Sequence, residues 1–305
     1  MYILLFALLL VGPAYAHVGD RIYSIPEISD ADLDRFDLHD TSLDDWRSIL
    51  VEPSLWATDF VADLTVGEGA PYDPADMDYQ FWLGWNGSTD RLYVAMERTD
   101  DTFVNEYDGG NLGDLWRHDG HFELFVDGDH SGGDIRGSGD LTEEERLLES
   151  NRTGQQYVAS AHAPDGKHIN CMGAILPGPG SKIRSGSEWV FSLPYADGGG
   201  GAFGETPSVS IFEGYVTPFD DLIWNSPEDS KKSDLVADKI IGLSISIPDF
   251  DTEPSAYRAF HTLTGAYDTW RSASNFSDCL LVGVKKETSV EDISWARIKA
   301  TFEEK

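Results

Sequence analysis

A dense set of oxygen ligands occupies the segment Asp127-Gly-Asp129-His-Ser131-Gly-Gly-Asp134. Three carboxylates and a hydroxyl fall at the first, third, fifth and eighth places of one loop, and hard oxygen ligands close together are what Ca²⁺ binds. An EF-hand would need a glutamate at the twelfth place, where Ser138 stands instead. The spacing therefore excludes an EF-hand and leaves open a shorter calcium loop. The alternative is a solvated acidic turn, in which aspartates accept turn hydrogen bonds.

Catalytic groups do not stand out in the same way. The chain holds 54 acidic residues, so a carboxylate pair of the kind that glycoside hydrolysis needs would arise by chance and cannot be singled out. A second acidic run, Asp249-Phe-Asp251-Thr-Glu253, matches a calcium loop less well. No nucleophile elbow, HExxH, phosphate-binding loop or CxxC is present. We therefore predict no catalytic residue.

The calcium loop follows a strand predicted over Gly120 to Val126. Side chains alternate along a strand, so Phe122 and Leu124 point to one face and Glu123 points to the other. A carboxylate is costly in an apolar core. The face that carries Glu123 is therefore predicted to be the outer one, the face that could bear a ligand.

Short strands separated by Gly, Pro and Asp fill most of the remaining chain. Residues 81–96 are typical of a hairpin around Asn86-Gly87, because this pair tolerates the positive φ of a tight turn. Further strands are predicted at Ile22–Ile28, Gln155–His162, Ser208–Val216, Lys239–Ile247 and Cys279–Val284. This pattern predicts an all-β protein, an antiparallel β-sandwich with jelly-roll-like layering and one or two short peripheral helices.

Three segments outside these strands have their own patterns. Residues 140–148 open with the capping box Thr142-x-x-Glu145 and predict a short helix. The run Asp197-Gly-Gly-Gly-Gly201 predicts a flexible loop, and the spacing in residues 287–305 predicts a helical tail. The tryptophans and phenylalanines of residues 46–85, Trp56 among them, are predicted to be mostly core.

Several of these residues resemble the family 9 carbohydrate-binding modules and the wider DOMON-like group of secreted β-sandwiches. The matching residues are the strand Leu92 to Ala95, its acidic exit Asp100 and Asp101, Trp116, Asp119, Glu123 to Asp127, and Ser131-Gly132. The resemblance covers most of the chain. It implies a calcium-stabilised module that recognises carbohydrate without catalysis and assists polysaccharide breakdown by association.

The resemblance also implies a sugar site. Family 9 modules that bind sugar hold it between two tryptophan rings. Trp116 matches the first ring, and Trp270 in Tyr-Asp-Thr-Trp-Arg is the best match for the second. The implied sugar contacts are Trp116, Glu123, Gln156 and Trp270. The family places an Arg and an Asn after its Gln-Tyr pair, where this chain has Val158 and Ser160, so two polar contacts are missing. Half-buried sandwich aromatics remain the alternative for both tryptophans.

Two cofactor alternatives stay open. Related DOMON domains bind haem for electron transfer through Met paired with His or Lys, and Met96, His121, His162 and Met172 are available here. A histidine at the start of a processed chain can also clamp copper with its own amine. His17 is a candidate for that role, but no second histidine stands at a recognisable spacing from it.

Composition and the first residues bear on location. Residues 1–16, MYILLFALLLVGPAYA, form an apolar run that is too short to span a bilayer and ends in Ala14-x-Ala16. It predicts a signal peptide cleaved after Ala16 and a secreted or periplasmic domain over residues 17–286. The net charge of -32 excludes nucleic-acid binding as the main activity, since phosphates would not be neutralised. Cys171 and Cys279 could pair in an oxidising compartment or stay as buried thiols.

Overall fold

The computed structural model describes residues 17–18, 21–137, 139–176, 182–204, 206–254 and 256–284. The predicted signal peptide and the predicted C-terminal helix lie outside these residues. Within them, no helix is long and apolar enough to cross a membrane.

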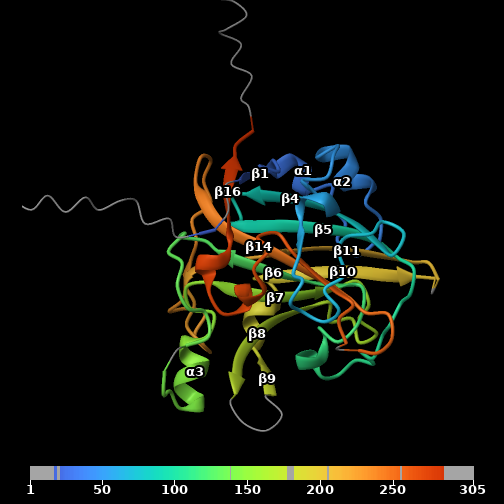
Figure 1. Cartoon of the computed structure of the whole chain (residues 1–305). Coiled ribbons are helices and arrows are strands. Elements are labelled where there is room, and N and C mark those ends of the chain that lie inside the picture. Colours follow the sequence, from blue (N-terminus) through green and yellow to red (C-terminus); the bar gives the residue numbers. More distant parts are fainter. Residues whose placement is uncertain are drawn as a thin grey trace, which may run out of the picture.

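Two sheets carry the fold (Figure 1). The first sheet has the strand order β1-β16-β14-β6-β7-β8-β9, with β15 pairing with β14 and β3 with β15. Its strands are β1 (Ile22–Pro26), β3 (Val61–Ala62), β6 (His121–Asp127), β7 (Gln155–Ser160), β8 (Ile169–Leu176), β9 (Lys182–Ser185), β14 (Ile240–Asp249), β15 (Ala259–Thr262) and β16 (Ser277–Val282). Its neighbours are antiparallel except for β1 beside β16.

The second sheet has the order β10-β11-β5-β4-β2. Its strands are β2 (Leu55–Trp56), β4 (Met77–Asn86), β5 (Arg91–Asp100), β10 (Ala196–Phe203) and β11 (Ser208–Val216), and a separate ribbon joins β12 (Phe219–Asp221) to β13 (Lys231–Lys232). The helical segments are α1 (Asp30–Leu33), α2 (Asp44–Ile49), α3 (Glu143–Glu149), η1 (Ala57–Asp59), η2 (Leu112–Asp114), η3 (Glu188–Phe191), η4 (Tyr267–Trp270) and η5 (Ala273–Asn275). The predicted antiparallel all-β sandwich is confirmed.

The main core lies between the inner faces of the two sheets. Phe122, Leu124 and Val126 of β6 point into it, as the alternation predicted. The outer face of the second sheet is covered by α1 and α2, where the buried Trp46 packs with Trp82. Removing these apolar faces from water is the largest favourable contribution to the fold.

Two elements predicted from local sequence patterns, the helix α3 and the hairpin of β4 and β5, are present in the structure. Thr142 caps α3, and its side chain and that of Glu145 bond reciprocally to each other's backbone N–H, which confirms the capping box. The hairpin of β4 and β5 is also confirmed, with Asn86 opposite Arg91. The positive φ of its turn belongs to Asp90, at 53°, and not to the Asn-Gly pair that predicted it.

The glycine run is a strand and not a flexible loop. Residues 196–203 form β10, which pairs with β11 along its whole length. A β-carbon on Gly200 would lie 2.8 Å from Ala161 Cα, and one on Gly199 would lie 2.6 Å from the Leu38 carbonyl oxygen. Glycine is therefore required because other segments pack closely against this strand.

The exposure of Trp56 and the state of the two cysteines can be compared with the predictions. Trp56 is 47% exposed, so its prediction as a core residue is wrong. Among the described residues, the fully buried tryptophans are Trp46, Trp82 and Trp85. Cys171 and Cys279 are both buried free thiols. Burial raises the pKa of Cys171 to about 12, as expected for an inert structural cysteine.

A buried ionic cluster joins the two sheets at one end. Arg98 on β5 is 1% exposed. Its Nη2 donates to Asp100, to Asp119 Oδ1 at 2.8 Å and to Asp249 Oδ1 at 3.3 Å, and its Nη1 donates to the Pro248 carbonyl at 2.8 Å. One guanidinium thus holds three carboxylates, which come from β5, β14 and the loop before β6.

Candidate functional site

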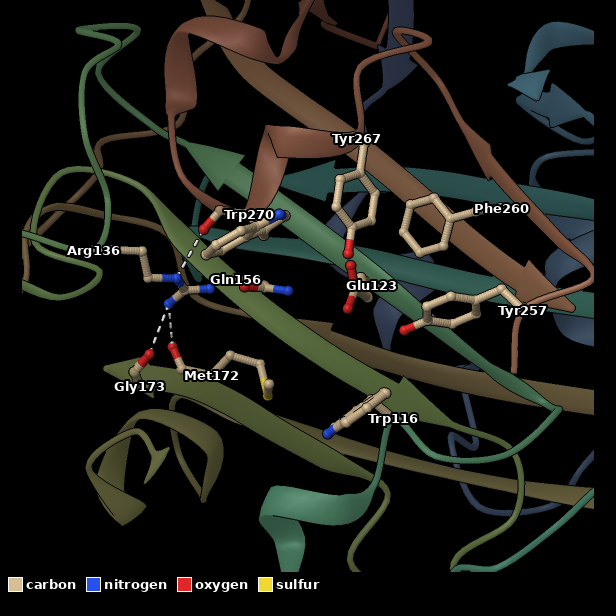
Figure 2. A pocket seen from close by; sticks show the side chains of 10 residues that line it. All are labelled: Trp116, Glu123, Arg136, Gln156, Met172, Gly173, Tyr257, Phe260, Tyr267 and Trp270. Atoms are coloured by element: carbon tan, nitrogen blue, oxygen red, sulfur yellow. Dashed lines mark hydrogen bonds between the residues drawn. The ribbon is translucent and has the colours of Figure 1, made fainter. Parts of the chain in front are cut away.

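A cavity of about 180 Å³ opens on the outer face of the first sheet. Figure 2 shows the residues that line it: Trp116, Glu123, Arg136, Gln156, Met172, Gly173, Tyr257, Phe260, Tyr267 and Trp270. All four residues predicted as sugar contacts are in this set, although they are up to 154 positions apart, from Trp116 to Trp270.

The sheet provides the floor of the cavity. Glu123 on β6 lies opposite Val158 of β7 and Ser246 of β14, so it sits near the middle of the sheet. Gln156 on β7 and Met172 on β8 come from the same outer face, because their neighbours Tyr157 and Cys171 point into the core. Strand alternation thus brings three side chains from three strands to one surface.

Loops provide the walls. Trp116 follows η2, and Trp270 ends η4; in Figure 2 their rings lie on either side of the cavity with Glu123 and Gln156 between them. Trp116 packs against the cluster of Leu115, Val158 and Met172. Tyr257, Phe260 and Tyr267 complete the aromatic wall.

Arg136 fixes the position of the Trp270 loop. Its Nε donates to the Trp270 carbonyl at 2.8 Å, and its Nη1 donates to the carbonyls of Met172 and Gly173 at 2.8 and 2.9 Å. The guanidinium is buried, so these charge-assisted bonds connect β8 to the loop in a poorly hydrated place. Arg136 is thus a positioning residue for one wall.

The floor and walls leave polar atoms for a ligand. Gln156 Oε1 and Trp270 Nε1 are buried and have no hydrogen-bond partner. A buried polar atom without a partner is costly, and one acceptor and one donor on residues that line a cavity suit a ligand with hydroxyl groups, which can donate and accept. The cavity therefore combines aromatic surfaces with unsatisfied polar groups, the usual composition of a small-molecule site.

The carboxyl of Glu123 has an unusual protonation equilibrium. Burial raises its pKa to about 7, while the positive charge of Arg136 and a hydrogen bond from Gln156 act in the opposite direction. The group is therefore partly protonated near neutral pH and can donate or accept a hydrogen bond to a ligand.

We expect Glu123 to make stability depend on pH. Its pKa is 4.5 in an unperturbed carboxyl and about 7 here, so the folded state binds the proton more tightly than the unfolded state. The stability that Glu123 contributes is fully present below the pKa of the group in the unfolded state. It is lost as pH rises through the pKa of the group in the folded state. The free energy of unfolding of Glu123→Gln should fall less between pH 4.5 and 7 than that of the wild type. The free energy of unfolding is measured by urea denaturation at several pH values. An equal change with pH in the wild type and in Glu123→Gln would contradict this assignment.

The residues of the predicted calcium loop make other contacts. Asp127 accepts the N–H of Gly132 at 2.7 Å and that of Ser131 at 3.2 Å. Asp129 also accepts the Ser131 N–H at 3.2 Å, and Asp134 accepts the Arg136 N–H at 2.7 Å. Burial and the neighbouring Asp127 carboxylate raise the pKa of Asp129. The first two carboxylates are therefore adjacent, whereas Asp134 faces its own turn.

Ligand-like groups gather elsewhere in the described part of the chain. Three sets place Asp or His ligand atoms within 4.8 Å of one another: Asp100, Asp119 and Asp249; Asp76, Asp101 and Asp251; and His17, His130 and Asp278. Arg98 neutralises the first set, and Arg258 pairs with Asp76 and Asp251 of the second at 2.8 and 2.9 Å.

The haem alternative gains no support from these positions. Met96 is buried in the core between the sheets. His121 lies on β6 one residue before the inward Phe122 and is stacked near Phe250. It therefore lies on the outer face of the first sheet, whereas Met96 lies between the sheets. Met172 accepts a hydrogen bond from Asn170 through its sulfur and lines the cavity.

Six of the ten residues that line the cavity were not predicted from the sequence as part of it: Arg136, Met172, Gly173, Tyr257, Phe260 and Tyr267. The aromatic density of residues 257–270 is a signal that could have pointed to the wall before Trp270. Nothing in the spacing around Arg136 indicates its role, because its partners come from β8 and the η4 loop.

Comparisons with known proteins give a fold-level likeness. No protein-family model matches the chain, and no curated protein matches it in sequence. Among solved structures, it is similar to a family 9 carbohydrate-binding module from Caldicellulosiruptor kristjanssonii in complex with glucose, at 14% identity and a TM-score of 0.48, over 88% of this chain and 100% of that one. A family 9 module from the same organism in complex with cellotriose is 13% identical, with a TM-score of 0.47, over 88% of this chain and 97% of that one.

Proposed function

We propose that this protein binds carbohydrate in the cavity between Trp116 and Trp270. The observation that carries the proposal is the pairing of two indole rings across a floor that holds Glu123 and Gln156. Aromatic rings cover the apolar C–H faces of a pyranose, and the carboxyl, amide and indole N–H groups bond its hydroxyls. The cavity of about 180 Å³ suits one sugar ring or a chain end better than a long chain segment.

The proposed role is recognition without hydrolysis. Glu123 is the single carboxylate among the described residues that line the cavity. Hydrolysis of a glycosidic bond by the usual mechanisms needs two carboxyl groups on either side of that bond. Any part in polysaccharide breakdown would then come from an enzyme that acts beside this protein.

Calorimetric titration tests the proposal directly. Glucose and cellotriose, the ligands of the two similar structures, serve as the first probes, followed by a wider panel of sugars. We expect saturable binding with one site per chain for at least one of them. Heat of dilution alone across the whole panel would refute a carbohydrate function.

We also propose a structural calcium ion at the loop of Asp127, Asp129, Ser131 and Asp134. The support is the adjacent carboxylates of the buried Asp127 and the exposed Asp129, whose mutual repulsion a divalent cation would relieve. Asp134 would have to turn away from the Arg136 N–H to join them.

Removing calcium is then expected to lower the melting temperature, because an ion that binds only the folded state stabilises it. The measurement compares melting of chelator-treated protein before and after calcium is added back. Asp129→Asn should lose most of the difference. Superimposable melting curves with and without calcium would count against the ion.

Export is the third proposal. The apolar run of residues 1–16 and its Ala14-x-Ala16 end support cleavage before His17 and a secreted or periplasmic location. Mass spectrometry of the exported protein should find His17 as the first residue. An exported chain that still begins at Met1 would show the prediction to be wrong.

A further inference from the structure

Two histidines and two aspartates meet at the C-terminal end of β6, outside the sugar cavity. His130 Nε2 lies 2.8 Å from Asp278 Oδ1, His17 Nδ1 lies 3.6 Å from the same oxygen, and His17 Nε2 lies 3.3 Å from Asp127 Oδ2. The centroids of the two imidazole rings are 3.9 Å apart. These side chains come from residue 17, the β6 loop and β16, so the tertiary fold alone brings them together.

The imidazole of His17 is buried without a proper partner. Its side chain has no exposed surface, and neither ring nitrogen has a hydrogen bond of acceptable geometry. The position is also closely packed, since a β-carbon on Gly242 would lie 2.4 Å from His17 Nε2. Two unsatisfied nitrogens inside a protein are costly, and both face carboxylates.

We propose that His17, His130 and Asp278 bind a divalent transition-metal ion, with Zn²⁺ as the reference metal. One ligand atom from each residue lies within 4.8 Å of the others. Zinc binds imidazole nitrogen and carboxylate oxygen at about 2.0–2.2 Å, so ligands around a tetrahedral ion are roughly 3.4 Å apart. The distances of 2.8 and 3.6 Å to Asp278 lie on either side of that value.

Asp127 has a supporting part in this site. Metal-binding imidazoles usually direct their second nitrogen toward a carboxylate, which fixes the ring and its tautomer. Asp127 is fully buried, is held by the Gly132 N–H at 2.7 Å, and faces His17 Nε2. His17 Nδ1 is then the nitrogen turned toward Asp278 and the ion.

The ligand set separates this site from a calcium site. Calcium takes six or more oxygen ligands, whereas two imidazoles and a carboxylate suit zinc, copper or nickel. The site needs only the side chain of His17, so it does not depend on cleavage after Ala16.

The test is a zinc titration of the full chain, purified without a histidine tag and kept in excess calcium. We expect one zinc per chain. His130→Asn and Asp278→Asn should each weaken binding at least about tenfold. Both side chains are partly exposed, at 28% and 29%, and asparagine tolerates the φ of 59° at position 130, so both variants should fold.

His39→Asn is the matched control, because His39 also pairs with an aspartate, Asp197, at 3.2 Å, on a separate surface. It should leave zinc affinity unchanged. Cobalt provides a second readout: wild-type protein should show visible absorption bands of bound Co²⁺ that zinc removes and that both variants lack. Absence of zinc binding, or equal affinity in the wild type and both variants, would overturn the proposal.

Discussion

Replacing Arg98 with methionine is expected to lower the free energy of unfolding by about 3–5 kcal/mol, the usual cost of removing one partner from a buried ion pair. Methionine fills much of the same space, so the loss comes from charge more than from packing. Without the guanidinium, Asp100, Asp119 and Asp249 would share a buried site whose nearest remaining positive charge is Arg258, 3.9 Å from Asp249 Oδ2.

The size of this loss should depend on pH. Burial raises the pKa of Asp249 to about 7 and that of Asp119 well above its usual range, and the charge of Arg98 opposes both shifts. In the variant the folded-state pKa values rise further, so protonation at low pH offsets the lost charge. We expect a smaller difference between variant and wild type at pH 5 than at pH 8.

Urea denaturation at the two pH values measures this effect. Arg21→Met is the control, because Arg21 forms an exposed ion pair with Asp59 and such pairs contribute about 1 kcal/mol or less. An Arg98→Met variant no less stable than Arg21→Met would show that the cluster does not hold the sheets together.

Truncating either cavity tryptophan to alanine is expected to cost about 1–3 kcal/mol of sugar affinity, or roughly 5–150-fold. Each ring would cover one face of the bound sugar, and alanine removes that flat surface. Trp270→Ala should have the larger effect, because it also removes the unpartnered Nε1 donor.

Trp56→Ala is the matched control for these variants. Trp56 is 47% exposed and lies on β2 at the edge of the second sheet, so sugar affinity should not change. Calorimetric titration of the three variants, with melting curves to confirm folding, provides the measurement. Affinities of Trp116→Ala and Trp270→Ala that equal the wild type would place any sugar site elsewhere.

Local patterns were enough to predict most strands and the outer face of β6. Alternation of Phe122, Glu123 and Leu124 depends on the backbone of one strand, and the capping box of α3 depends on one turn. Such features are written in neighbouring residues, because strand geometry fixes which side chains share a face. The family resemblance also identified four of the cavity residues, because it matches positions in the order of the chain.

The other features of the fold and the cavity depend on contacts between segments that are far apart in the chain. The glycines of β10 form a strand because they pair with the distant β11, and Ala161 and Leu38 pack closely against two of them. Burial falls on Trp46, Trp82 and Trp85 instead of Trp56. Arg136 meets Trp270 only when β8 and η4 are folded together.

The same holds for His17 and His130, which no sequence spacing connects but which lie with ring centroids 3.9 Å apart. The strand order β1-β16-β14-β6 brings the start and the end of the domain beside its centre. The hydrophobic period and the composition of a segment indicate which of its faces packs against a core. Which segments meet each other depends on pairing between strands far apart in the chain, and that information is distributed over the whole fold.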